Sequence, residues 1–138
     1  RLPSKKLIES FAEEGGTVYS YLFTLEFPYK NGKTAYHCAD IPFVFHNTEL
    51  VPVANIEGVT EKVENQRFEA IMQFARTGNP NHSGISEWKP CTKDEENIMI
   101  FDRECEVKVN HDHNLLALHE KHFDMIKMAK FMKEQAED

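Results

Sequence analysis

The sequence predicts an α/β fold of short buried strands with packed helices, in which the sheet is incomplete. Residues 17–23 are rich in β-branched and aromatic side chains and are apolar on both alternating faces, as in a strand covered on two sides. Residues 97–101 form a second short apolar run, and helical periodicity surrounds both segments. Two such strands leave sheet edges unpaired, so we expect further strands to lie outside this chain.

The first expected helix covers residues 4–14. Its apolar residues recur at helical spacing, Ser4 is a candidate N-cap, and Gly15 and Gly16 supply a stop. After the first strand, a loop containing Asn31 continues into a proline-containing stretch, which we expect to be irregular and functional.

The second expected helix covers residues 60–77 and ends at Gly78 and Pro80. Its expected inner face is mostly apolar and consists of Glu64, Phe68, Ile71, Met72 and Ala75. Val107 and Val109 alternate with a lysine in an expected edge strand, and a last helix is expected from about residue 114. The apolar positions of this last helix are Leu115, Leu116, Leu118, Phe123, Met125, Ile126, Ala129 and Met132.

Length and composition predict one domain, residues 1–138, that forms a single unit. The hydrophobic fraction of 41% and charged fraction of 28% argue against disorder and against a membrane protein. A net charge of −7 argues against nucleic-acid binding. Cys38, Cys91 and Cys105 are widely spaced, which favours neither a disulfide framework nor a zinc ribbon, and we expect a cytoplasmic location. The chain starts at Arg1 without a signal peptide, so we expect it to come from a longer protein.

Residues 35–45 set a histidine with an acidic neighbour in a loop between apolar elements. In open α/β sheets reactive groups collect beyond the carboxyl ends of strands, which is where this loop is expected, so His37 is a candidate site residue. Taken alone, a loop histidine is more often a surface residue. Asp40 is expected to cap the following turn rather than to shape the site entrance. Cys38 adjoins His37, but adjacent side chains diverge, so we interpret it as a packed or partly exposed cysteine.

Four segments together carry a resemblance to a known family. They are residues 18–23 (VYSYLF), 37–45 (HCADIPFVF), 74–81 (FARTGNPN) and 88–92 (WKPCT). In this order they resemble the C-terminal quarter of the type-B carboxylesterases, the family of the cholinesterases and the bacterial para-nitrobenzyl esterases. The chain departs from that family at Cys38 and His46, where glycine is usual, and at Ile71, where tryptophan is usual.

The resemblance implies the C-terminal portion of an α/β-hydrolase fold, from a serine esterase that hydrolyses small-molecule carboxylic esters through an acyl-enzyme without a cofactor. It implies that His37 is the catalytic general acid and base. The fold's chain order is serine, acid, histidine, so we expect the nucleophile and the acid in a missing N-terminal portion. Ser86 follows Gly84 but lacks the second glycine of a G-x-S-x-G elbow, so we interpret it as a loop serine. We therefore expect this chain alone to be inactive.

Two other classes of function remain open. The chain could belong to a non-catalytic, esterase-like interaction module that lacks the nucleophile. It could also bind a metal through His111, His113, His119 and His122, although a polar helix start with incidental histidines is favoured. Exposed strand edges also favour self-association of the chain. Trp88 and the segment 43–45 are expected to be core or pocket wall.

Overall fold

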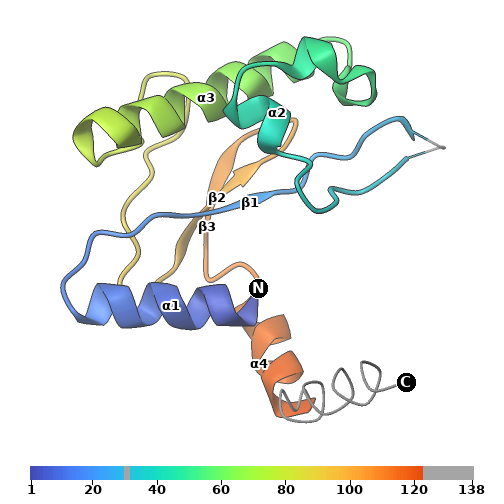
Figure 1. The fold of residues 1–138 in the computed structure, drawn as a ribbon. Helices are drawn as coiled ribbons and strands as arrows, with labels where there is room; N and C mark the ends of the chain where they lie inside the picture. Colours follow the sequence, from blue (N-terminus) through green and yellow to red (C-terminus); the bar gives the residue numbers. More distant parts are fainter. Residues whose placement is uncertain (30–31, 123–138) are drawn as a thin grey trace, which may run out of the picture.

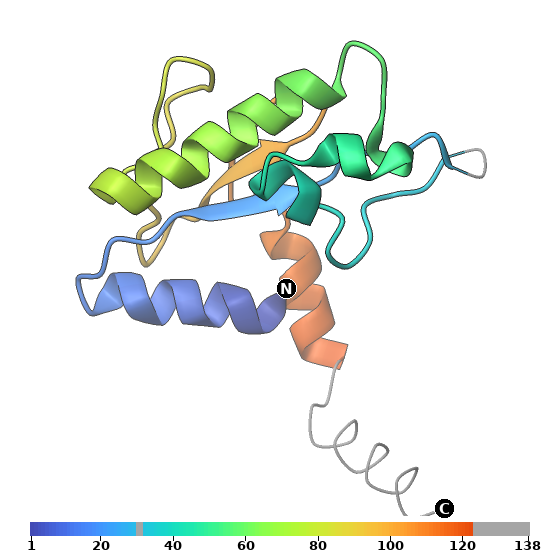
Figure 2. The same ribbon diagram turned by 45° about the horizontal axis from the view of Figure 1, so that its top comes forward.

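The computed structural model describes residues 1–29 and 32–122, which form three layers (Figure 1). Helices α2 (Ile41–Val44) and α3 (Thr60–Thr77) cover one face of a small sheet, and α1 (Leu2–Glu13) lies on the opposite side. The turned view in Figure 2 keeps this order of layers. The prediction of an α/β architecture is confirmed.

The sheet has the order β1-β2-β3. Strand β1 (Ser20–Phe23) pairs in parallel with β2 (Asn97–Phe101), and β2 pairs antiparallel with β3 (Glu106–Val109). Every residue of β2 is buried, as expected of a central strand with a partner on each side. The predictions of a buried strand at 97–101 and an edge strand after it are confirmed.

Strand β1 is shorter and less covered than the sequence predicted. It begins at Ser20 instead of residue 17, and the side chain of Tyr21 is 39% exposed. Within the described residues β1 pairs on one side only, with β2. Ser20 is buried and Leu22 and Phe23 are half-buried, so the expected burial of this strand is observed only in part.

Helix α1 begins before the predicted N-cap. Arg1 is its N-cap residue, and Pro3 lies in its first turn, where a fixed φ suits a helix and a missing N–H costs nothing. Ser4 is therefore inside the helix, and its prediction as a cap is wrong. Gly15 ends the helix as expected, because its φ of 81° is readily adopted only by glycine.

Helix α3 has the predicted bounds. It ends at Gly78, whose φ of 75° places it in the left-handed region and whose N–H donates to the carbonyl of Phe74 at 2.8 Å.

The buried face of α3 differs from the predicted one. The residues buried on α3 are Thr60, Val63, Glu64, Arg67 and Ala70. Among the predicted residues only Glu64 is buried; Phe68, Ile71 and Met72 are half-buried and Ala75 is exposed. The prediction failed because the true face contains an arginine, which a hydrophobic pattern counts as solvent-facing.

Helix α4 (His113–His122) starts one residue before the expected position. Leu116 is buried, whereas Leu115 and Leu118 are 67% and 56% exposed, so among the described positions of the predicted apolar face only Leu116 is buried. The further apolar positions at 123–132 lie outside the described residues. None of the described helices is both long and apolar enough to cross a membrane.

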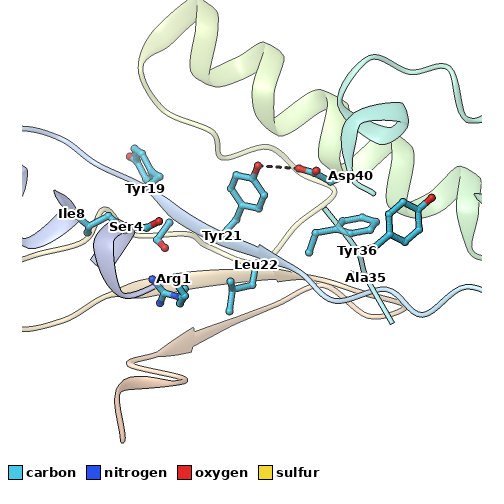
Figure 3. Close-up of a pocket in the computed structure, with 11 residues that line it drawn as sticks. Arg1, Ser4, Ile8, Tyr19, Tyr21, Leu22, Ala35, Tyr36 and Asp40 are labelled. Atoms are coloured by element: carbon cyan, nitrogen blue, oxygen red, sulfur yellow. Dashed lines mark hydrogen bonds between the residues drawn. The ribbon is translucent and has the colours of Figure 1, made fainter. Parts of the chain in front are cut away.

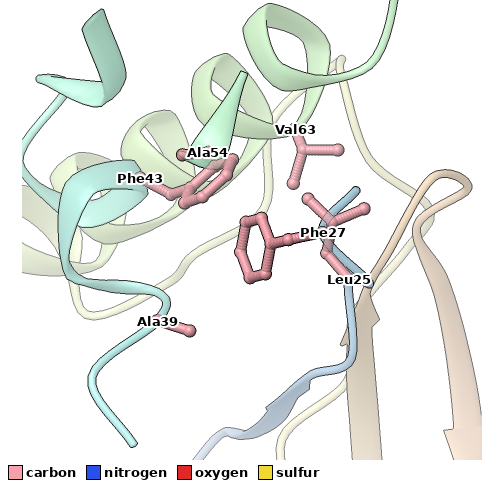
Figure 4. Packing of buried hydrophobic residues seen from close by; sticks show 6 residues of the cluster. All are labelled: Leu25, Phe27, Ala39, Phe43, Ala54 and Val63. Carbon is pink, nitrogen blue, oxygen red and sulfur yellow. The ribbon is translucent and has the colours of Figure 1, made fainter. Parts of the chain in front are cut away.

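The main core joins the loop after β1 to the helical layer. Figure 4 shows its six buried residues, which are Leu25, Phe27, Ala39, Phe43, Ala54 and Val63. The stretch that we expected to be irregular forms α2 and two short 3₁₀ helices, Thr48–Leu50 and Pro52–Ala54. Phe43 and Ala54 hold it in place, because both are buried in one cluster with Val63 of α3.

A second core lies where β2 packs against α3. It contains Ala70, Met99, Phe101 and Trp88, and the indole Nε1 of Trp88 donates to the carbonyl of Asn97 at 3.0 Å. The prediction of Trp88 as a core residue is confirmed.

Replacing Phe43 tests this packing. Phe43 is fully buried beside Phe23 and Phe27, whereas Phe45, two residues later, is 67% exposed. Phe43→Ala should reduce the free energy of unfolding by about 3–5 kcal/mol, because it leaves a cavity. The matched control Phe45→Ala should change it by less than about 0.5 kcal/mol. Urea titration of the 138-residue chain measures both, and equal losses would contradict the described packing.

Candidate functional site

The candidate histidine lies on a turn, residues 37–40, that follows the carboxyl end of β1. The preceding loop is closed by Phe27 and Lys33, which exchange two backbone hydrogen bonds of 2.8 Å. In the turn itself, the N–H of Ala39 donates to Tyr36 at 3.0 Å, and the N–H of Ile41 donates to Cys38 at 3.2 Å. The backbone around His37 is therefore fixed by local hydrogen bonds.

The two sides of this turn have different environments. Ala39 is 4% exposed and packs into the main core, whereas His37 and Cys38 are exposed. Within residues 1–29 and 32–122, the imidazole of His37 makes no hydrogen bond. The core thus holds the turn from one side, and the ring of His37 is open to groups from outside the described chain.

Asp40 does not cap the helix that follows it. It occupies the N-cap position of α2, but its side chain makes no capping hydrogen bond. A cap bonds the N–H of the second or third helical residue, and the second residue here is Pro42, which has no N–H. The prediction of Asp40 as a cap is wrong.

The carboxylate of Asp40 instead joins two other elements. Its Oδ2 accepts a hydrogen bond of 3.0 Å from the hydroxyl of Tyr21 on β1, and it lies 3.4 Å from Nη2 of Arg67 on α3. Figure 3 shows Asp40 facing the Tyr21 hydroxyl. We call Tyr21, Asp40 and Arg67 the Asp40 clamp.

Arg67 is the residue of this site that sequence reasoning missed. Its side chain is 1% exposed, and its guanidinium carbon lies 3.7 Å from the ring centre of Tyr21 and 5.0 Å from that of Phe101. Its Nε and Nη1 are buried without a hydrogen-bond partner in the described part of the chain. A signal was present, because Arg67 stands four residues after Val63 and three before Ala70, at core spacing.

The environment of Tyr21 keeps its hydroxyl protonated, so that it can donate a hydrogen bond. Burial raises the pKa of the phenol; the positive charge of Arg67 opposes this rise, and the negative charge of Asp40 adds to it. The net pKa lies above the ordinary value of 10.0, so Tyr21 stays protonated and donates to Asp40 near neutral pH.

A cavity of about 470 Å³ extends along β1 beside the clamp (Figure 3). It is lined by Arg1, Ser4, Ile8, Tyr19, Ser20, Tyr21, Leu22, Phe23, Ala35, Tyr36 and Asp40. The cavity thus reaches from α1, along the strand, to the residues that flank the histidine turn.

The described residues do not complete a catalytic set around His37. Ser86 is exposed in the loop between α3 and β2, as the sequence predicted, and no hydrogen bond connects a described serine or carboxylate with the ring of His37. The carboxylate of Asp40 is occupied by Tyr21 and Arg67. Within the turn, the ring of His37 is thus without a described partner, whereas the carboxylate of Asp40 is engaged.

The four histidines considered for metal binding do not form one cluster. Among the described residues, the group of three potential ligands that lies within 4.8 Å contains His113 with Glu96 and Asp112. Arg1 donates to Glu96 at 2.7 Å and to Asp112 at 2.9 Å. A protein cation already contacts both carboxylates, so this group is an ion-pair network.

Two backbone positions near the site carry strain. Cys38 has a φ of 67° and His46 a φ of 53°, and these are the two positions where the resemblance sets glycine. The left-handed region is unfavourable for residues with a Cβ. The three cysteines are free, as the sequence predicted.

Comparison with known proteins gives consistent relatives. Residues 1–119 match the carboxylesterase family. The chain is 28% identical over 93 residues to a phenmedipham hydrolase of Pseudarthrobacter oxydans, covering 63% of this chain and 19% of that protein.

Two solved structures are similar in fold and sequence. One is an esterase from anaerobic Clostridium hathewayi that can hydrolyse aliphatic aromatic polyesters, with 56% identity and a TM-score of 0.85 over 89% of this chain and 25% of that one. The other is a carboxylesterase of Geobacillus stearothermophilus, with 32% identity and a TM-score of 0.66 over 78% of this chain and 22% of that one. The chain thus spans about a quarter or less of the relatives that it matches.

Glycine at position 38 should relieve the strain beside His37. A left-handed backbone costs a non-glycine residue about 1–2 kcal/mol, and the extra chain entropy of glycine offsets about 0.5–1 kcal/mol. Cys38→Gly should therefore raise the free energy of unfolding by about 0.5–1 kcal/mol. Cys38→Ser, which also removes the thiol but keeps a Cβ, is the control and should give no gain. Urea unfolding of the chain measures both, and an equal gain from serine would show that φ is not the cause.

The ion-pair network around Glu96 should make the free energy of unfolding depend on pH. Burial raises the pKa of Glu96, but hydrogen bonds from Arg1, Ser20 and His113 outweigh it, so the net pKa lies below the ordinary 4.5. A carboxyl with a lowered folded pKa contributes stability that is present above pH 4.5 and is lost as the pH falls through the folded pKa. Glu96→Gln should be less stable than the parent at neutral pH, and the difference should narrow below pH 4.5.

Unfolding curves across that pH range measure the difference. The matched control is Glu69→Gln, at an exposed glutamate in the middle of α3, which should follow the parent at every pH. A Glu96→Gln difference that does not change with pH would contradict the assignment.

Proposed function

The chain belongs to the carboxylesterase family, and from that premise we propose that it supplies the catalytic histidine of a serine esterase. Its incomplete sheet with packed helices is that of part of an α/β-hydrolase fold, the fold of the esterases that it resembles. The whole protein would hydrolyse carboxylic esters through an acyl-enzyme, with His37 as the general acid and base.

One observation carries the assignment of His37. Its imidazole is exposed and free of hydrogen bonds to described residues, while the backbone on both sides of it is bonded and the neighbouring Ala39 is buried. A general base needs a fixed position and a free lone pair. The turn supports the first requirement, and the open ring supports the second.

The chemistry requires partners for this histidine. A serine hydroxyl is a weak nucleophile until an imidazole accepts its proton, and the resulting imidazolium then protonates the leaving alkoxide. A carboxylate would hold the imidazole in one tautomer and stabilise its charged form, and backbone N–H groups would stabilise the oxyanion. We propose that a further part of the protein supplies these groups, so that this chain alone is inactive.

The free edge of β1 is our candidate place for that part. Parallel strands have their carboxyl ends at the same edge of a sheet, where reactive groups collect. An acid at the carboxyl end of a strand paired with β1 would therefore lie close to the turn of His37. The cavity along β1 reaches Tyr36 and Asp40, which flank that turn.

The substrate is a small-molecule ester in this proposal. The similar esterase of Clostridium hathewayi can hydrolyse aliphatic aromatic polyesters, so such a polyester is a second substrate to test beside a short nitrophenyl ester. We also propose a cytoplasmic location, because three free thiols are typical of a reducing compartment.

Replacement of His37 in the whole protein tests the proposal. His37→Ala should lower the rate of nitrophenyl ester hydrolysis by a factor on the order of 10⁴ to 10⁶, because the serine loses its proton acceptor. The matched control is His111→Ala, at an exposed histidine outside the turn, which should keep full activity. The 138-residue chain alone should release no nitrophenol, and steady turnover by it would overturn the proposal. A whole protein that is folded but inactive before any replacement would favour the interaction module instead.

A further inference from the structure

We propose that Arg67 and Tyr21 are positioning residues for His37, and that they act through the carboxylate of Asp40. The Asp40 clamp would hold the histidine turn at a fixed place above the end of β1. This inference rests on the proposed role of His37 and deepens it.

A single oxygen atom joins three elements. Oδ2 of Asp40 accepts from the Tyr21 hydroxyl on β1 and contacts Nη2 of Arg67 on α3, while Asp40 itself belongs to the turn. Any shift of the turn away from the sheet must lengthen the first contact, and any shift away from the helix must lengthen the second. The clamp therefore restrains the turn in two directions.

The restraint reaches His37 through a short, bonded segment. Asp40 is three residues from His37, and the backbone hydrogen bonds of Ala39 and Ile41 close the turn between them. Ala39 is buried in the core, so the turn cannot pivot freely about its middle. A change in the position of Asp40 is thus transmitted to the backbone that carries the imidazole.

Stability alone does not explain an arginine at position 67. The side chain is 1% exposed, its contact with Asp40 is long at 3.4 Å, and two of its nitrogens have no partner in the described chain. Removing a charge from water is costly, and replacing a buried ion pair by apolar residues of similar volume is often neutral or stabilising. The guanidinium offers direction instead, because it is held against the rings of Tyr21 and Phe101 while one of its nitrogens faces Asp40.

Three variants of the whole esterase separate positioning from folding. Tyr21→Phe removes only the hydroxyl, Arg67→Met removes the charge and keeps the volume, and Asp40→Asn with Arg67→Met removes the ion pair without leaving a buried charge alone. Each should lower kcat by roughly tenfold to a hundredfold and leave KM within about twofold. The double variant, Asp40→Asn with Arg67→Met, should melt within about 2 °C of the parent, or higher.

Lys62→Met is the matched control. Lys62 is also a basic residue of α3 that pairs with a carboxylate, Glu104, at 2.8 Å, but this exposed pair does not touch the turn. It should keep the kcat of the parent. If Lys62→Met lowers kcat as much as Arg67→Met does, loss of any ion pair on α3 explains the effect and the inference is wrong.

Amide hydrogen exchange gives a readout that does not depend on activity. In the whole esterase, Arg67→Met and Tyr21→Phe should speed exchange at Ala39 and Ile41, whose N–H groups close the turn. Exchange at Gly78, whose N–H closes the far end of α3, should not change. Unchanged exchange at Ala39 and Ile41 would overturn the inference.

The failure of this inference differs from the failure of the proposed function. An inactive His37→Ala enzyme together with a normal kcat in all three clamp variants would overturn the inference alone. A His37→Ala enzyme that keeps its activity would overturn the proposed function, and the inference with it.

Discussion

The contact between the carboxylate of Asp40 and the buried guanidinium of Arg67 joins the parts of this structure that matter for its chemistry. Arg67 lies against the rings of Tyr21 on β1 and Phe101 on β2, so the same residue that meets Asp40 also packs α3 onto the sheet. The charge is expensive to bury, and it is tolerated because aromatic faces and one carboxylate surround it. Sheet, helix and histidine turn therefore share one constraint. The main core supports the same arrangement from the other side, through the buried Ala39.

The elements that the sequence predicted well are those whose signals are local. Residues 60–77 combine a long helical segment with a glycine that can adopt a positive φ, and both bounds of α3 are as predicted. The strand at 97–101 is a continuous apolar run, and every one of its residues is buried. The face of α3 was predicted wrongly because burial of Arg67 depends on Tyr21 and Phe101, which are distant in sequence. A periodicity argument assigns each residue by its own polarity and has no access to such partners.

The candidate site also combines features that the sequence predicted with features that only the structure shows. His37 was found through the family resemblance, since composition and spacing alone favour a surface histidine. The structure adds the reason why the turn can present it: the backbone passes through the left-handed region at Cys38, next to His37, and again at His46. At both positions the backbone follows a path that glycine would adopt without strain. Strain of this kind persists only where surrounding contacts determine the backbone, and at Cys38 those contacts are the buried Ala39 and the clamped Asp40.

Within the described residues, the ring of His37 has no hydrogen-bond partner and one edge of β1 has no paired strand. The topology of the sheet connects these two features. Among the described residues β1 has one strand neighbour, β2, so the backbone groups along its other edge have no strand partner there. The histidine turn follows the carboxyl end of this same strand, so in the proposal a strand paired along that edge and the partners of the imidazole would lie close together. An element that completes the backbone bonding of β1 would also bring its own carboxyl end to His37. In the proposal, completion of the sheet and assembly of the catalytic set are thus one structural event, and His37 in this chain should be insufficient by itself.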